Sequence, residues 1–390
     1  MSRIKTVTIG NSSICNSIFK YKIVIALLLL PFFKNSFYGY IGNLALIFNI
    51  FIFIEAIIFC VLFLFERVTN RYVKFIFIFL IWTYFVSPFA HGHTAPSMYY
   101  FYEAIGVISI FELGFKYNAD NTIEASSSLF AIMTVLNYAT LYVFPGGLGT
   151  ADGTAMYLFG IRTGFSLYII PGILLNLIRD VRNETIISLR TIVIILFGTA
   201  ALFNQSVATG LLQLSVIGSL YLLLHNPKIA KKLNIYIFTL VFFVLDFLIT
   251  IFGTKFNLLG YVASLFGKDP TFSNRTFIWA NAVSKISQSP IFGFGADNMV
   301  SGGTHMLQAH NQWLNIAIEG GYISLALFLM GIFASMYALY KAKNYRWYRP
   351  VAICISAMLI GSISEIQTYV PFIYFVFDLP FLLEEKRWSD

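Results

Sequence analysis

The chain has 390 residues, of which 58% are hydrophobic, 18% are aromatic and only 11% are charged. Soluble globular domains do not have such a composition, which excludes an ordinary soluble enzyme or binding domain. The formal net charge of +8 is explained by basic loops that face anionic lipid, so no nucleic-acid partner is expected. The sequence therefore predicts an all-α, polytopic membrane protein.

Apolar runs of membrane-spanning length recur along the whole chain. A spanning helix needs roughly 20 mainly apolar residues, because backbone groups in hydrocarbon must be hydrogen-bonded within the segment. By this criterion we count about twelve runs and expect them to form a single integral membrane domain, residues 1–390. The approximate ranges are 21–38, 41–65, 73–90, 98–115, 126–144, 155–178, 187–203, 207–224, 233–252, 313–340, 351–365 and 366–383.

The distribution of lysine and arginine predicts the orientation in the membrane, because short cytoplasmic loops carry most of the positive charge. With the N-terminus inside, 20 of the 26 basic residues fall on the cytoplasmic side and five on the outer side, while Arg162 lies within a predicted helix. We therefore expect both termini in the cytoplasm. The one large polar loop, residues 253–312, is expected to be extracytoplasmic and to contain amphipathic helices.

The first predicted element of this loop is an amphipathic helix over residues 274–288 at the membrane surface. Apolar residues recur at helical spacing from Trp279 to Ile286, and Pro290 supplies a stop signal. Arg275 lies near the start of this helix, where the backbone N–H groups also favour an anion. It is therefore a candidate phosphate-binding residue.

A glycine-rich turn over residues 293–298 and a polar stripe follow. The turn is weak evidence on its own, because any tight turn at a membrane surface uses glycine. Asn311, Asn315 and Glu319 share one helix face at the outer end of a run that becomes wholly apolar after Gly321. Such a stripe usually lines a water-filled cavity.

The polar residues of this loop occur in a distinctive order, namely Arg275, Trp279, Ser289-Pro290-Ile291-Phe292-Gly293-Phe294-Gly295, His310-Asn311 with Leu314, and Glu319-Gly320-Gly321. This order resembles the signature loop of the O-antigen ligase and Wzy-type O-antigen polymerase superfamily. Arg162-Thr163-Gly164 is also similar to a membrane arginine that precedes a glycine in that family. The resemblance implies a bacterial membrane glycosyltransferase that uses undecaprenyl-diphosphate-linked glycans at the outer face of the cytoplasmic membrane.

One element of the family pattern differs in this chain. The family often has a Ser-Arg pair at the start of the helix that here begins near Val207, whereas this sequence has Gln205-Ser206 before it. One cationic phosphate contact is therefore absent, or it is supplied by Lys255, Lys268 or Lys285.

The expected chemistry follows from the donor that the resemblance implies. A polyprenyl-diphosphate sugar carries its own activation energy, so the protein must hold the diphosphate, stabilise the leaving group and deprotonate the acceptor hydroxyl, without cofactor or metal. Arg275 and Arg162 suit the first two tasks, because guanidinium makes bidentate contacts with phosphate. His310 is the candidate general base, since an unperturbed imidazole titrates near about 6.5. The candidate substrate contacts are Arg162, Asn311, Asn315, Glu319, Asp297 and Trp279.

These residues also have structural interpretations. The alternatives are an ion pair with Glu103 for Arg162, an interfacial position for Arg275 and His310, and helix packing for Glu319. His91 and His93 lack carboxylate or cysteine companions, so no metal site is expected there.

The function that we predict is polymerisation of O-antigen or capsule repeat units, with inversion at the anomeric carbon. An O-antigen ligase that transfers the glycan to lipid A-core or to protein is the close alternative. A lipid-linked oligosaccharide flippase or other transporter, and a non-catalytic scaffold of the cell envelope, are alternatives of other classes. The expected partners are undecaprenyl-diphosphate-linked oligosaccharides and membrane lipid, with a chain-length regulator and a flippase as further candidates.

Overall fold

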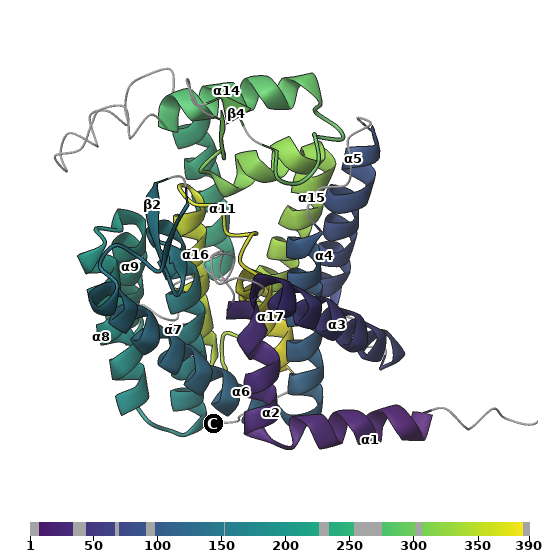
Figure 1. Ribbon diagram of the computed structural model, residues 1–390, viewed down its shortest axis with the longest axis vertical. Coiled ribbons are helices and arrows are strands. Elements are labelled where there is room, and N and C mark those ends of the chain that lie inside the picture. Colours follow the sequence, from purple (N-terminus) through teal and green to yellow (C-terminus); the bar gives the residue numbers. More distant parts are fainter. Residues whose placement is uncertain are drawn as a thin grey trace, which may run out of the picture.

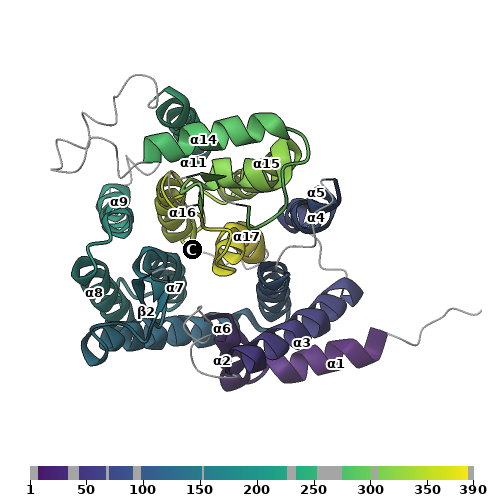
Figure 2. The same ribbon diagram turned by 45° about the horizontal axis from the view of Figure 1, so that its top comes forward.

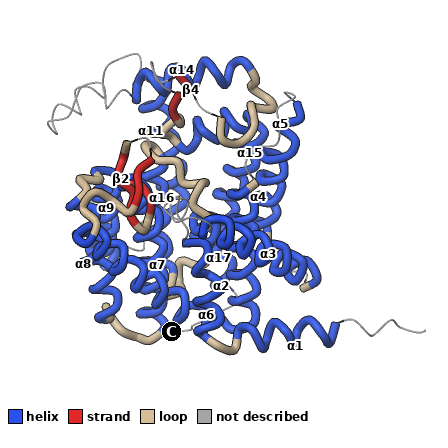
Figure 3. The backbone as a smooth tube through the Cα atoms, in the orientation of Figure 1, coloured by secondary structure: helices blue, strands red, loops and turns tan. Residues whose placement is uncertain are grey.

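The computed structural model describes residues 8–33, 44–66, 70–90, 98–151, 153–225, 234–252, 275–298, 300–301 and 306–384. Figure 3 shows that helices account for nearly all of the regular structure, with two small sheets toward one end. The predicted all-α class is confirmed. The loop predicted at 253–312 is described from Arg275 onward with short gaps, and Lys255 and Lys268 lie outside the described residues.

The helical elements follow in chain order. They are α1 (Thr8–Phe19), α2 (Lys22–Leu29), η1 (Leu30–Phe33), α3 (Leu44–Phe65), α4 (Arg71–Ile81), η3 (Trp82–Val86), α5 (Ser87–Ala90), α6 (Tyr99–Val143), η4 (Arg162–Gly164), α7 (Phe165–Arg182), α8 (Leu189–Asn204), α9 (Ala208–His225), α11 (Ile235–Phe247), η5 (Leu248–Phe252), α14 (Arg275–Gln288), α15 (Gln312–Lys341), α16 (Tyr348–Ser362) and α17 (Phe372–Glu384).

The two sheets are short and antiparallel. The first has the order β1 (Gly149–Ala151), β2 (Thr154–Tyr157) and β3 (Gly160–Ile161), with Met156 opposite both Gly149 and Ile161. The second pairs β4 (Val300–Ser301) with β5 (Met306–Leu307). In Figure 1, α14 covers one end of the molecule and α1 lies at the opposite end.

Burial differs between the centre and the periphery of the helical assembly. Figure 2 shows α16 and α17 in the middle, surrounded by the other helices. Phe372 and Phe375 of α17 are fully buried, and the Phe375 ring stacks on Phe111 with centroids 3.9 Å apart. By contrast, the side chains of Leu46 and Leu64 in α3 are 60% and 62% exposed. A helix that is apolar on an exposed face is expected where lipid is the solvent.

Within the described residues, five helices are long and apolar enough to cross a membrane, or up to six if the bent pair Ser13–Phe19 and Lys22–Phe33 is one span. These helices fit a multi-pass membrane protein. The prediction of about twelve spans is not confirmed.

Several predicted runs have a different local structure. The run at 155–178 begins with two strands, and Arg162 is the first residue of the helical segment Arg162–Arg182 that follows them. Glycines in the left-handed region, Gly147, Gly153 and Gly160, turn this part of the chain into hairpins. The runs at 98–115 and 126–144 belong to α6, which is interrupted by non-helical backbone angles at Asn118.

The last two predicted runs are displaced in the structure: α16 begins three residues earlier than the run at 351–365, and α17 is shorter than the run at 366–383. A non-helical segment, residues 363–371, separates α16 from α17. It contains the polar side chains Glu365, Gln367 and Thr368 and ends at Pro371. Proline is well tolerated next to a helix start, because its missing N–H group would have no partner there. This segment reaches the candidate site.

Candidate active site

A break in α15 gives the candidate site its framework. The backbone of Gly321 has φ 68° and ψ −169°, which interrupts the helix and frees the carbonyl groups before it. The glycine-rich turn after α14 donates backbone hydrogen bonds to those carbonyl groups. The N–H of Phe294 donates to the carbonyl of Ile318 at 2.8 Å, and that of Gly295 donates to Glu319 at 2.7 Å. The two halves of the signature loop are therefore bonded to each other.

Only glycine fits where these two backbones meet. A Cβ atom added to Gly293 would lie 2.5 Å from the carbonyl carbon of Glu319, and one added to Gly321 would lie 2.1 Å from the carbonyl oxygen of Ile291. Both glycines also have φ values in the left-handed region. Their place in the signature is therefore explained by close backbone packing.

Side chains of α5 and η3 form further hydrogen bonds at this break. The Ser87 hydroxyl donates to the carbonyl oxygen of Glu319 at 2.5 Å and accepts from the N–H of Gly295 at 2.8 Å. The indole of Trp82 donates to the carbonyl of Gly320 at 2.8 Å. Buried backbone groups at the break are thus paired, as a stable interior requires.

The polar stripe of α15 holds the segment 363–371 in place. The Tyr369 hydroxyl donates to Glu319 at 2.5 Å and accepts from the side-chain amide of Asn315 at 3.2 Å. Glu319 also accepts from the backbone N–H of Asp297 at 3.2 Å. The predicted substrate contacts Asn315 and Glu319 are therefore bonded to Tyr369. Tyr369 lines the cavity described below, whereas Asn315 and Glu319 do not.

Asn311 caps α15 and points away from the other two residues of the stripe. Its side-chain oxygen accepts from the N–H groups of Trp313 and Leu314, both at 3.0 Å, as an N-cap does. Its amide group donates to the carbonyl of Ile363 at 3.2 Å and to Asp246 at 3.4 Å. Asn311 borders a mostly apolar cavity of about 350 Å³ between α11, α14 and α15. The three stripe residues thus do not face one common cavity.

A polar cavity of about 410 Å³ lies where four parts of the chain converge. The start of α6, the β3–α7 connection, the residues before α15 and the segment 363–371 form its walls. Aromatic and charged side chains both face this space. The lining residues are Tyr99, Tyr100, Glu103, Phe159, Gly160, Ile161, Thr163, Gly164, Leu167, Tyr168, Gln308, His310, Glu365, Ile366, Tyr369 and Val370.

His310 and Glu365 line this cavity, and the predicted residue Arg275 pairs with Glu365. A guanidinium nitrogen of Arg275 lies 3.4 Å from a carboxylate oxygen of Glu365, and both side chains are largely buried, at 18% and 10% exposure. Burial raises the pKa of Glu365 to about 7, and Arg275 opposes that rise. Burial and, second, the positive charge of Arg275 lower the pKa of His310 to about 4. His310 is therefore neutral at pH 7.

Local backbone geometry directs His310 into the cavity. Its φ of 47° lies in the left-handed region, and the next residue is the extended cap Asn311. A non-glycine residue in this region is held there by its surroundings at some energetic cost. The neighbouring hydrogen bonds of Asn311 supply that restraint.

Arg162 lies beside this cavity in η4 and is exposed. The next two residues, Thr163 and Gly164, line the cavity wall. Within the described residues Arg162 forms no salt bridge, so the alternative of a structural pair with Glu103 is not observed. Glu103 instead accepts a hydrogen bond from the Tyr99 hydroxyl.

The remaining predicted residues lie farther from the cavity lining. Trp279 is fully buried in a cluster with Ile278, Ala282 and residues of α15. Asp297 is exposed in the glycine-rich turn, with φ 62°. Lys285 donates to Asn298 at 3.1 Å and does not line the cavity. The pair His91 and His93 lies outside the described residues.

Glu365 and Tyr369 are the site residues that the sequence did not reveal. Glu365 lies at the division between the last two apolar runs, and Tyr369 lies four residues beyond it. A cluster of polar residues before Pro371, within an otherwise apolar region, was the available signal.

The fold and the site together define a multi-pass membrane protein with a charged cavity at one end of its helices. Residues 191–329 match a family model described as O-Antigen ligase. This segment contains α14, the glycine-rich turn, His310-Asn311 and the break in α15, so the resemblance to the O-antigen ligase and Wzy-type polymerase superfamily is confirmed there. Arg162 and Glu365 lie outside the matched segment. The comparisons with curated proteins and with solved structures found no match.

Proposed function

We propose that this protein is a polysaccharide polymerase of the Wzy type. It would join undecaprenyl-diphosphate-linked oligosaccharide repeat units at the outer face of a bacterial cytoplasmic membrane. The observation that carries this proposal is the cavity of about 410 Å³ that holds His310 and Glu365, with Arg275 paired to that carboxylate. The family match across residues 191–329 supports the same type of chemistry.

The proposed reaction is a direct displacement. An oxygen of the acceptor sugar forms a bond to the anomeric carbon of the growing glycan, and the bond from that carbon to the donor phosphate oxygen breaks. Undecaprenyl diphosphate leaves with the electron pair, and the anomeric configuration inverts. The protein must then supply charge for the diphosphate and a base for the acceptor proton.

Arg275 is the proposed phosphate ligand. In the structure its guanidinium contacts a carboxylate at 3.4 Å, which is a long contact for a charge-assisted pair. A diphosphate could take over this guanidinium with shorter, bidentate contacts. Exposed Arg162 and the N–H groups at the start of α7 lie on the β3–α7 side of the cavity and are further candidates.

Two residues are candidates for the general base. His310 is neutral and can accept a proton, but a pKa of about 4 makes it a weak base. The pKa of Glu365, about 7, is better matched to the working pH. Arg275 lowers the pKa of Glu365. If the donor draws Arg275 away, this effect is lost and the carboxylate becomes more basic still. We therefore favour Glu365 as the base and place His310 beside the acceptor hydroxyl.

Aromatic side chains would contact the sugars. The rings of Tyr100 and Tyr369 stack with centroids 4.7 Å apart, and both line the cavity. Amphipathic rings of this kind offer an apolar face and a hydroxyl group to a ligand. Asn315 and Glu319 would then act by positioning Tyr369.

The ligase alternative uses the same donor and the same charged groups, and the match to an O-Antigen ligase family model favours it. Ligase and polymerase differ only in the acceptor. A flippase would instead be expected to have its polar residues near the middle of the membrane.

A reconstituted reaction with the lipid-linked repeat unit tests these functions. Wild type should make long chains, whereas Arg275→Gln and Glu365→Gln should leave single repeat units on the outer side. Arg182→Gln, which changes an arginine at the other end of the molecule, is the matched control. Long chains that need a second acceptor to leave undecaprenyl diphosphate would indicate a ligase. Units trapped on the cytoplasmic side would indicate a flippase, and unchanged products would disprove the assigned site.

A further inference from the structure

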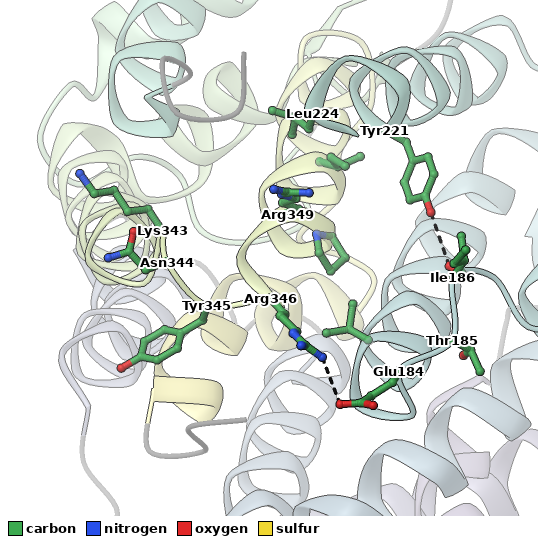
Figure 4. Close-up of a pocket in the computed structure, with 13 residues that line it drawn as sticks. Glu184, Thr185, Ile186, Tyr221, Leu224, Lys343, Asn344, Tyr345, Arg346 and Arg349 are labelled. Carbon is green, nitrogen blue, oxygen red and sulfur yellow. Dashed lines mark hydrogen bonds and ion pairs between the residues drawn. The ribbon is translucent and has the colours of Figure 1, made fainter. Parts of the chain in front are cut away.

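A second polar cavity lies at the end of the molecule opposite α14. Its volume is about 530 Å³. It is bounded by the connection from α7 to α8, the end of α9 and the start of α16 (Figure 4). The α7–α8 connection lies far from α14 in Figure 3. This cavity is therefore separate from the proposed active site.

The cavity has an excess of positive charge. Among the described residues, three basic side chains line it, Lys343, Arg346 and Arg349, together with one acid, Glu184. Arg346 pairs with Glu184 at 3.2 Å, and both side chains are exposed, which makes the pair weak. Arg349 is exposed and makes no hydrogen bond or salt bridge within the described residues. Figure 4 shows Arg346 and Arg349 on the wall that faces Ile186.

Three other arginines at this end of the molecule are neutralised by acids. Glu124 pairs with Arg179 at 2.6 Å and with Arg190 at 3.0 Å. Asp120 pairs with Arg182 at 2.8 Å. These three arginines are thus matched by carboxylates, whereas Arg349 of the cavity pairs with no carboxylate within the described residues. An anion from outside the protein would complete the charge balance.

The other wall of the cavity is apolar. Val181, Ile186, Leu224 and Ile353 contribute to it, and Ile186 is 81% exposed. An exposed isoleucine beside basic groups is typical of the boundary between lipid chains and headgroups. Tyr221, which donates to the carbonyl of Ile186 at 3.4 Å, lies at the same boundary.

We propose that this cavity binds the phosphate of an anionic phospholipid headgroup. Arg346 and Arg349 hold the phosphate, and the apolar wall contacts the start of the acyl chains. Because the cavity joins the α7–α8 connection to the start of α16, the bound lipid stabilises the packing of these elements. The proposal stands independently of the reaction at the other end.

The test measures lipid binding to the purified protein in neutral detergent, by native mass spectrometry and by the midpoint of thermal denaturation. Phosphatidylglycerol is expected to bind and to raise the midpoint, whereas phosphatidylcholine is not. The double variant Arg346→Gln, Arg349→Gln should lower the affinity for phosphatidylglycerol roughly 30-fold. Lys341→Gln removes an exposed charge at the same end outside the cavity and should change the affinity less than about threefold.

Three results would overturn the proposal. They are equal binding of phosphatidylcholine, wild-type affinity in the double variant, and binding of glycerol 3-phosphate as tight as that of phosphatidylglycerol. The last result would make the cavity a site for a soluble anion. If the double variant is not recovered folded, Arg349→Gln alone changes only an exposed side chain and should still lower the affinity roughly fivefold.

Discussion

The protein contains two clusters of arginine and glutamate side chains, which differ in how completely the carboxylate is paired. Near the α7–α8 connection, each carboxylate oxygen of Glu124 meets an arginine, Arg179 at 2.6 Å and Arg190 at 3.0 Å. At the other end, Glu365 pairs within the described residues with Arg275 alone, at 3.4 Å, and borders a cavity of about 410 Å³. A carboxylate whose two oxygens are both paired with arginines stabilises the fold. A carboxylate with one long contact beside a cavity can release its arginine, which is then able to bind a ligand.

The largest expected effect of this difference is on catalysis. Arg275→Gln should lower the rate of polymerisation about 10²- to 10³-fold, because it removes a positive charge at the leaving group. The rate is measured with the reconstituted protein and its lipid-linked repeat unit. Arg190→Gln is the control, and it should keep the rate while lowering the stability. Equal loss of rate in both variants would mean that the two groups do not differ in function.

The cavity also depends on the break in α15. Gly321→Ala should destabilise the protein by about 3 kcal/mol or prevent folding, because its backbone conformation is suited only to glycine and a Cβ would collide with Ile291. Thermal denaturation in detergent measures the loss. Gly218→Ala is the control, since a Cβ there meets no atom within 4 Å. If both variants were equally stable, the glycine-rich turn would not be the support that its geometry indicates.

The pH dependence of the rate distinguishes the two candidate bases. A general base must be deprotonated, so kcat/KM should rise with pH around the pKa of Glu365, about 7. Glu365→Gln should abolish this rise and lower the rate about 10²-fold. If the rise is instead centred near 4, the pKa of His310, and is abolished by His310→Gln, then His310 is the base.

The smallest expected effect on the rate is at Glu124, whose two carboxylate oxygens are both paired with arginines. Glu124→Gln should lower the free energy of unfolding by about 1–2 kcal/mol, because two partly exposed guanidinium groups lose their ion pair with Glu124. The polymerisation rate at a temperature where the protein is folded should stay within twofold of wild type, roughly the scatter of such assays. A large loss of rate without loss of stability would place catalytic function at that end of the molecule.

Much of the framework was predictable from local sequence patterns. The amphipathic helix predicted at 274–288 is confirmed as α14, and Pro290 follows its end. The glycine-rich turn after this helix is also observed, and the structure adds that Gly293 and Gly321 are points of close backbone contact. The strands between Gly149 and Ile161 were missed, because an apolar aromatic run favours strand and helix alike when hydropathy is averaged.

The site was predicted less completely than the framework. Arg275 and His310 were identified from the motif, but Glu365 is separated from Arg275 by 90 residues and was counted as part of a membrane run. The polar stripe was predicted to line a cavity. Tertiary contacts instead direct Asn311 toward Asp246 and place Tyr369 between the cavity and Glu319.

By itself the sequence determined the class of protein, the amphipathic helix and the family resemblance, because these depend on composition and on neighbours within a few residues. Only the tertiary structure decided which charges are matched and which face open space. A pKa of about 7 for Glu365 arises from burial and from one arginine of a distant helix. Desolvation and long-range proximity exist only once the helices have packed, so no local pattern could have revealed them.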